Sequence, residues 1–204
     1  GAETDATLGA RRGPVLLAAN HRAAVDTALL AFVTPRPVAF LGKAEYFTGA
    51  GLRSRLSARF LTALGYIPVD RDHAKAGLAA LDAARRVLDR GGVFAIYPEG
   101  TRSRDGRLHR GHTGVASLAL STGATVVPVA LVGTQQVQPV GARMPRLAPV
   151  QVRFGRPLDF SRYEGLEGSA AIRRAVTDEV MDAIVSMSGQ EYVDRYHPLP
   201  GRAA

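Results

Sequence analysis

The sequence predicts an α/β protein built on a single mixed, largely parallel sheet covered by helices. Short apolar runs of strand length alternate along the chain with longer segments in which apolar residues recur every three or four positions. Strands that alternate with helices through short connections favour parallel pairing. With 46% of its 204 residues apolar, the chain can bury a sizeable core. We expect one domain over residues 14–190, with a flexible lead-in at 1–13 and a loosely attached tail at 191–204.

Charge and residue types narrow the possible chemistry. The net charge of +8 at pH 7 favours an anionic partner, which includes nucleic acid, an acidic membrane surface and a phosphate-bearing substrate. The chain has no Cys, so disulfides, thiolate catalysis and a Cys-ligated zinc site are excluded. No apolar run approaches the ~18 residues of a membrane-spanning helix, and no signal peptide is visible. We therefore expect a chain that does not cross a membrane.

The first predicted strand and helix flank a possible catalytic base. Residues 16–19 predict a short buried strand, and residues 23–33 predict a helix with an apolar face. His21 then lies at the strand-to-helix turn, beside Asn20 as a turn or cap residue. Side chains five apart on one helix diverge by about 140°, so His21 and Asp26 meet most easily if His21 precedes the helix.

An imidazole held by a carboxylate is the arrangement of a general base. His21 could take a proton from an alcohol near neutral pH, and Asp26 would fix the tautomer and stabilise the imidazolium. A chain with five His and many Asp contains one His-x4-Asp pair by chance roughly one time in four. On this pattern alone, catalysis and a structural pairing are equally open.

A second strand and a basic helix follow. Residues 38–41 predict a strand that delivers Lys43 to its end, where ligands bind in open α/β sheets. Residues 51–65 predict a helix with one apolar stripe and with arginines elsewhere. We expect the stripe to face the core, with docking on an anionic membrane surface as the alternative. Residues 67–71 then form a short extended piece. The stripe consists of Leu52, Leu56, Phe60 and Leu64.

The remaining elements complete the sheet and its helical cover. Residues 74–90 predict a scaffold helix that stops at two glycines, and residues 93–97 predict a buried strand. Pro128 lies inside the strand predicted at 125–132, so we place that strand near an edge or with a bulge. The other predicted elements are a short helix at 111–121, a loop at 133–149, a strand at 150–154 and an amphipathic helix at 169–187.

The loop at 98–106 is the second chemical centre. Gly100 lets a ligand approach the backbone closely. Thr101 and Ser103 offer hydroxyls, and Arg102 and Arg104 offer planar guanidinium groups suited to phosphate. Glu99 is interpreted as the partner of a cation or of a substrate hydroxyl. These residues predict an anion site, with a plain polar turn as the alternative.

Two histidines beyond that loop raise the question of a metal. His109 and His112 are three residues apart, but no nearby carboxylate pattern supports a metal reading. We therefore predict no metal site.

Four blocks, taken in order, resemble the glycerolipid acyltransferase family, in particular the 1-acyl-glycerol-3-phosphate acyltransferases. Blocks of this kind in this order, over roughly residues 14 to 160, do not arise together by accident. The third block, with its Pro-Glu-Gly-Thr-Arg-Ser run, is the most specific. The blocks are Asn20 to Asp26, Gly42 to Phe47 with Ile67 to Arg71, Phe94 to Ser103, and Val126 to Ala130.

The resemblance implies a fold like that of glycerol-3-phosphate acyltransferase, O-acyltransferase activity and no cofactor. His21, held by Asp26, would deprotonate the free hydroxyl of 1-acyl-glycerol-3-phosphate. The oxygen would then attack the thioester of acyl-CoA or acyl carrier protein, giving phosphatidic acid. The residues implied to bind the acceptor and its phosphate are Lys43, Arg71, Glu99, Gly100, Thr101 and Arg102.

The resemblance also implies an anionic membrane surface as partner, no nucleic acid, and a cytoplasmic location, peripheral on the inner face of the cell membrane. Members of the family commonly carry an N-terminal helical segment that contacts the membrane, whereas only about 20 residues precede His21 here. Alternative acceptors are glycerol 3-phosphate and another lysophospholipid. The rival functions are a basic nucleic-acid-binding domain, a non-catalytic lipid- or acyl-carrier-binding protein, and a thioesterase.

Overall fold

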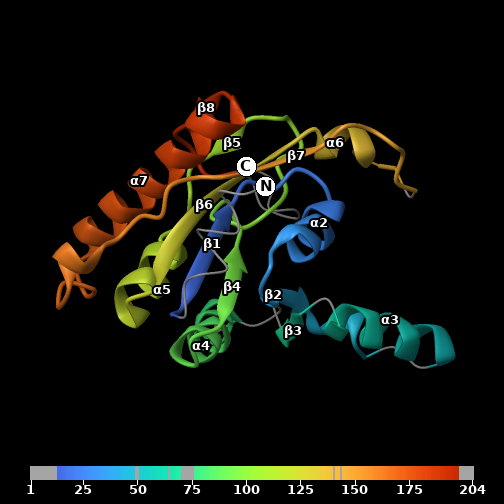
Figure 1. Cartoon of the computed structure of the whole chain (residues 1–204), viewed down its shortest axis with the longest axis horizontal. Helices are drawn as coiled ribbons and strands as arrows, with labels where there is room; N and C mark the ends of the chain where they lie inside the picture. Colours follow the sequence, from blue (N-terminus) through green and yellow to red (C-terminus); the bar gives the residue numbers. More distant parts are fainter. Residues whose placement is uncertain are drawn as a thin grey trace.

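A computed structural model describes residues 13–48, 51–63, 65–69, 76–139, 141–142 and 144–197 of the chain. Its central feature is a six-stranded sheet in the order β3-β2-β4-β1-β6-β7 (Figure 1). The first five strands in this order pair in parallel and β7 runs antiparallel to β6, which confirms the predicted mixed, largely parallel sheet. The strands are β1 (Val15–Ala19), β2 (Val38–Lys43), β3 (Tyr66–Val69), β4 (Val93–Ile96), β6 (Thr125–Val132) and β7 (Gln151–Phe154).

Helices cover both faces of this sheet. Side chains alternate along β1, so Leu16 and Ala18 face one layer, and Val15, Leu17 and Ala19 face the other. Helices α4, α5 and α7 pack on the first face and α2 packs on the second (Figure 1). The helices are α2 (Val25–Val33), α3 (Leu52–Ala63), α4 (Ala76–Asp89), α5 (Gly114–Thr122), α6 (Thr134–Val137) and α7 (Ala170–Ser188), with 3₁₀ turns η2 (Ala44–Tyr46) and η3 (Ser161–Tyr163).

The longest helix, α7, begins and ends one residue later than the predicted range of 169–187. The hydroxyl of Ser169 accepts a hydrogen bond from the backbone N–H of Ile172, which caps the first turn. Gly189 follows the last turn with a φ of 67°, the left-handed conformation that glycine adopts most readily. The helix buries one apolar face against β6 and α5, which fixes one wall of the core. That face consists of Val176, Val180, Met181 and Ile184.

Helix α3 does not bury the apolar stripe that its sequence suggested. Leu52 and Leu56 are 84% and 69% exposed, so the expectation that the stripe faces the core is wrong for these two residues. Figure 1 shows α3 projecting beyond the edge strand β3, so most of its length has no sheet beneath it. The side chain of Phe60 and the whole of Leu64 lie outside the described part of the chain.

Strand β6 resolves the position of Pro128. This strand lies between β1 and the edge strand β7, so it is next to an edge of the sheet, as one of the two predicted alternatives has it. Val129 pairs with Phe154, and Val126 pairs with Leu158. Three residue steps along β6 therefore lie opposite four residue steps along the partner segment, so that segment contains a bulge. The carbonyl of Pro128 accepts a hydrogen bond from Gly155 N–H within this interval. The proline therefore lies where the ladder is already irregular.

The tail is attached to the body as far as the structure describes it. Strand β8 (Tyr192–Val193) pairs in parallel with β5 (Leu108–His109), forming a separate two-stranded sheet. The ring of Tyr196 stacks on His112, with centroids 4.7 Å apart. Residues 192–196 thus contact the body of the protein through β8 and Tyr196, and two-residue strands leave no periodic pattern by which such contacts could be predicted. The lead-in at 1–12 lies outside the described residues.

Among the described helices, none combines the length and the apolar character needed to cross a membrane.

Candidate active site

The carboxyl ends of the parallel strands meet at one edge of the sheet. This edge receives Asn20 and His21 from β1, Tyr97 from β4, and the backbone of Lys43 from β2. The Lys43 side chain lies outside the described part of the chain, as does Arg71 entirely. The structure therefore places Lys43 at the expected edge and leaves its contacts open.

His21 and Asp26 are in direct contact. The Nδ1 atom of His21 lies 2.8 Å from Oδ2 of Asp26, whose side chain is completely buried. The same oxygen accepts hydrogen bonds from the backbone N–H groups of Arg22 and Ala23, at 2.6 and 2.8 Å. Helix α2 begins only at Val25, so His21 precedes it, as the angular argument requires. Three donors on one oxygen hold this carboxylate firmly beside the imidazole.

This geometry leaves one ring nitrogen of His21 as a hydrogen-bond acceptor. Because the carboxylate accepts a hydrogen bond from Nδ1, the lone pair of a neutral His21 ring lies on Nε2. The ring of Tyr97 stacks on the imidazole with centroids 3.9 Å apart and planes 12° from parallel. The hydroxyl of Tyr97 lies 2.9 Å from the Thr27 hydroxyl, which ties the tyrosine to α2. Burial raises the pKa of Tyr97, so the ring stays neutral.

Asn20 is a structural bridge rather than a helix cap. Its side chain is buried, donates to the Leu131 carbonyl at 3.1 Å and accepts from the Leu131 N–H at 2.7 Å. It also donates to Oε1 of Gln190 at 2.6 Å, and Nε2 of Gln190 donates to the carbonyl of Gly106 at 2.8 Å. This network connects the His21 turn to β6, to the second residue after α7 and to the loop at 98–106. Gln190 was missed by sequence reasoning because it lies 170 residues from Asn20.

Glu99 lies beneath the His21 turn. Its side chain is 1% exposed, and its Oε2 atom accepts a hydrogen bond from the backbone N–H of His109 at 3.0 Å. Burial raises the pKa of Glu99 to about 7, although the backbone groups of His109 and His21 lower it. The N–H of Ser103 donates to the His21 carbonyl at 2.8 Å, which fastens the loop to the turn.

The other predicted loop residues face outward. Gly100 has a φ of 74° and its N–H donates to the carbonyl of Tyr97, so it makes a tight turn directly after β4. Thr101 is half-buried and Arg102 is exposed. The structure therefore brings together His21, Asp26 and Glu99, while Arg102 lies at the surface of the same loop.

Arg22 is a cation that sequence reasoning did not select. Its side chain is half-buried, and burial lowers its pKa while the nearby Asp26 and Glu99 raise it. Gly106 lets the guanidinium pass close by, because a Cβ at that position would lie 3.2 Å from Nη2. Its place next to His21 in the sequence was the available signal.

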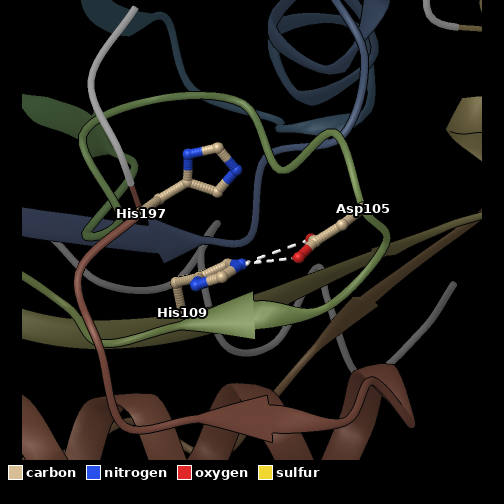
Figure 2. Close-up of side chains that lie close together, drawn as sticks. All are labelled: Asp105, His109 and His197. Carbon is tan, nitrogen blue, oxygen red and sulfur yellow. Dashed lines mark hydrogen bonds and ion pairs between the residues drawn. The ribbon is translucent and has the colours of Figure 1, made fainter. Parts of the chain in front are cut away.

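A second cluster lies on the far side of the loop. Figure 2 shows Asp105, His109 and His197, with Nε2 of His109 lying 3.1 and 3.2 Å from the two carboxylate oxygens of Asp105. The ring of His197 lies edge-on to His109, with centroids 4.6 Å apart. The expectation that no carboxylate lies near His109 is therefore wrong, since Asp105 is four residues before it. His112 points elsewhere and stacks on Tyr196.

An apolar cavity of about 860 Å³ opens beside α2. It lies between α2, the C-terminal end of α3 and the segment from Val137 to Val150. Val25 lines the cavity and directly precedes Asp26, so the cavity reaches the first turn of the helix that contains Asp26. Phe32 and Leu147 also line the cavity and are strongly exposed at the protein surface.

Comparison with known proteins finds a family match over the part of the chain that contains His21 and Asp26. A sequence model described as Acyltransferase matches residues 4–132, which include the His21 turn, the loop at 98–106 and β6. The chain belongs to the acyltransferase family.

Members of the acyltransferase family with curated names cover most of this chain. A 1-acyl-sn-glycerol-3-phosphate acyltransferase of Chlamydomonas reinhardtii is 33% identical over 139 residues, which are 68% of this chain and 40% of that protein. A chloroplastic 1-acyl-sn-glycerol-3-phosphate acyltransferase of Arabidopsis thaliana is 31% identical over 60% of this chain and 34% of that protein. The chain thus spans less than half the length of these acyltransferases.

A solved acyltransferase structure shares the fold. The crystal structure of the 1-acyl-sn-glycerophosphate acyltransferase PlsC of Thermotoga maritima matches with a TM-score of 0.63 at 23% sequence identity. The match covers 93% of this chain and 71% of that one. It agrees with the predicted acyltransferase-like architecture.

Proposed function

We propose that the chain transfers a fatty acyl group from acyl-CoA, or from acyl carrier protein, to the free hydroxyl of 1-acyl-glycerol-3-phosphate, giving phosphatidic acid. The observation that carries this proposal is the 2.8 Å contact between Nδ1 of His21 and the buried Asp26. It supplies an oriented base at the sheet edge where ligands bind. Membership of the acyltransferase family supports the reaction class, and the names of the relatives support the acceptor.

The proposed reaction is a direct transfer. Nε2 of His21 takes the proton of the acceptor hydroxyl while that oxygen bonds to the thioester carbonyl carbon. The tetrahedral intermediate then collapses, the carbon–sulfur bond breaks, and the imidazolium returns the proton to the departing thiolate. Asp26 stabilises the imidazolium between these two steps. Every atom and proton is accounted for by the two substrates and His21, so no cofactor or covalent enzyme intermediate enters.

The acceptor phosphate is assigned to cations at the same edge. Arg102 lies exposed on the loop at 98–106, and Lys43 is the last residue of β2. With Arg71, these residues would hold the phosphate and so position the hydroxyl. Gly100 and Thr101 shape the loop beside it. Glu99 supports the loop from below through its bond with the N–H of His109.

The acyl chain is assigned to the apolar cavity beside α2. Its volume of about 860 Å³ falls within the roughly 300–1,000 Å³ of ligand sites. Each buried methylene contributes about 0.8 kcal/mol, so an apolar cavity of this size favours a long chain. The position of Val25, between the cavity and Asp26, would place the thioester end of such a chain near His21.

The exposed apolar residues near this cavity support docking on a membrane. Phe32 and Leu147 lie at the cavity, and Leu52 and Leu56 lie on α3, whose C-terminal end also lines it. Arg55 and Arg59 are exposed on the same helix, and their charge suits anionic lipid headgroups. We therefore assign the surface formed by the exposed residues of the cavity and of α3 to peripheral contact with the inner face of the cell membrane.

The test is thiol release from a long-chain acyl-CoA, with and without 1-acyl-glycerol-3-phosphate in anionic vesicles. We expect release that requires the acceptor, and a loss of about 10²–10⁴-fold in His21→Ala, the span of a lost general base. His112→Ala is the matched control, because it removes an imidazole outside the dyad. Release that is independent of the acceptor would indicate a thioesterase, and full activity in His21→Ala would overturn the proposal.

A further inference from the structure

The cluster of Asp105, His109 and His197 has no part in the proposed reaction. Its members come from three segments, namely the loop after β4, strand β5 and the tail after β8 (Figure 2). One donor atom from each residue lies within 4.8 Å of the others. We propose that these three side chains form a zinc-binding site.

The types of ligand atom in this cluster favour zinc. Two imidazole nitrogens and one carboxylate oxygen suit Zn²⁺, whereas Mg²⁺ and Ca²⁺ prefer oxygen ligands alone. Donors about 2.1 Å from a tetrahedral zinc ion lie roughly 3.4 Å from one another. Nε2 of His109 is already 3.1 and 3.2 Å from the Asp105 oxygens. Rotation of the partly exposed His197 ring brings in the third donor, and water takes the fourth position.

Neighbouring groups orient the carboxylate of Asp105. The Ser103 hydroxyl and the Arg107 N–H each lie 3.1 Å from Oδ1 and orient the group. Outer hydrogen bonds of this kind accompany carboxylates that bind metals.

The Arg107 guanidinium is the group that competes with a cation. Its Nε lies 3.1 Å from Oδ2 of Asp105. The side chain is 47% exposed, however, and a second acid, Glu191, lies 4.0 Å from its Nη1. An arriving ion can therefore displace Arg107 towards Glu191 without leaving a buried charge unpaired.

A bound ion would join the tail to the loop beneath the dyad. His109 provides the backbone N–H that binds Glu99, and His197 belongs to the tail that pairs with β5 through β8. Zinc would thus hold residues 192–197 against the loop at 98–106. It would act on the catalytic edge only through this positioning, because its ligands are distinct from His21 and Asp26.

The test is calorimetric titration of ZnCl₂ into the full chain purified free of metal. We expect one equivalent to bind, and His197→Gln and Asp105→Asn each to weaken binding by at least about tenfold. His112→Gln is the control, because its imidazole stacks on Tyr196 outside the cluster. Circular dichroism verifies that each variant is folded, and the visible absorption of bound Co²⁺ reports the coordination shell independently.

The outcomes are distinct. Saturable binding that is lost in His197→Gln and kept in His112→Gln establishes the site. Absence of saturable binding in the wild type overturns the proposal, as does equal affinity in the wild type and His197→Gln. Because His197 lies near the surface, its substitution leaves the core intact and the comparison informative.

Discussion

The ring of Tyr97 lies parallel to the imidazole of His21, with centroids 3.9 Å apart and planes 12° from parallel. The tyrosine is the first residue after β4, and the histidine is the second after β1. Since β1 and β4 are adjacent parallel strands, the sheet itself sets the stacking distance. The orientation of the base therefore depends on two neighbouring strands as well as on Asp26.

Removing this stacked ring should slow turnover. We expect Tyr97→Ala to lower kcat by about 10–100-fold, because the imidazole loses one of the two contacts that set its plane. Tyr97→Phe keeps the ring and loses only the hydroxyl contact with Thr27, so its kcat should stay within about threefold of the wild type. Steady-state thiol release measures both. A Tyr97→Phe variant as slow as Tyr97→Ala would assign the effect to the hydroxyl instead.

Glu99 should make stability depend on pH in a defined direction. Its pKa is about 7 in the folded protein, against an ordinary value of 4.5, so between these values the folded state holds a proton that the unfolded state has lost. Its contribution to stability is therefore present at low pH and is lost as pH rises through 7. Glu99→Gln cannot ionise, and it should gain on the order of 3 kcal/mol relative to the wild type between about pH 5 and about pH 8.

Urea unfolding of both proteins across this pH range measures that difference. The amide oxygen of Gln can still accept the hydrogen bond from the N–H of His109, so the variant keeps the native contact. Stability curves that run parallel for the two proteins would show that Glu99 does not titrate in this window.

Gln190 should act on the rate through position. Gln190→Ala removes the hydrogen bonds to Asn20 and to the Gly106 carbonyl. The buried polar groups left unpaired should lower the stability of the fold by about 1–3 kcal/mol. We expect a lower kcat, because the imidazole of His21 shifts. The KM values of the acceptor and of the thioester should stay nearly unchanged, because the cationic side chains that bind the acceptor stay in place. Gln136→Ala, at an exposed glutamine, is the matched control. A change confined to KM would instead place Gln190 in a binding role.

Alanine substitutions at two arginines should distinguish a specific role in acceptor binding from a general effect of positive charge. Arg102→Ala should raise the KM of the acceptor by about tenfold and leave the KM of the thioester unchanged, because it removes a guanidinium that can bind phosphate through two hydrogen bonds. Arg86→Ala, at an exposed arginine on α4, is the control. Initial rates over a grid of both substrates measure the two constants. Equal effects on both substrates would argue against a phosphate contact.

Helix α3 should carry part of the attachment to membranes. Leu56→Gln should weaken binding to anionic vesicles several-fold, since the exposed leucine would otherwise bury its side chain in the headgroup region. Leu78→Gln, at an exposed leucine on α4, changes the same chemistry on another helix and should leave binding unchanged. Co-sedimentation with vesicles checks both variants, and equal losses would indicate non-specific adhesion.

Local patterns predicted most of the architecture. The apolar period of α7, like the buried runs at β1, β4 and β6, depends on neighbours within a few residues. The contact between His21 and Asp26 followed from the angular step of a helix. In each case the information lies in a single segment of chain.

The parts that sequence reasoning missed depend on distant neighbours. The periodicity of α3 shows which side is apolar and says nothing of what covers it, and Leu52 proved to be exposed. The two-residue strands β5 and β8 are too short to leave a pattern, so the attached tail could not be foreseen. The bridge from Asn20 to Gln190 joins segments that no spacing rule connects.

That bridge also bears on when the protein becomes competent during synthesis. Asn20 is made early, yet its side chain contacts Leu131 and Gln190, which follow it by 111 and 170 residues. A growing chain can form β1 and the His21 turn, but it cannot complete their support before the residues after α7 leave the ribosome. An incomplete chain thus lacks the buried hydrogen bonds that hold the His21 turn against the end of α7 and the loop at 98–106.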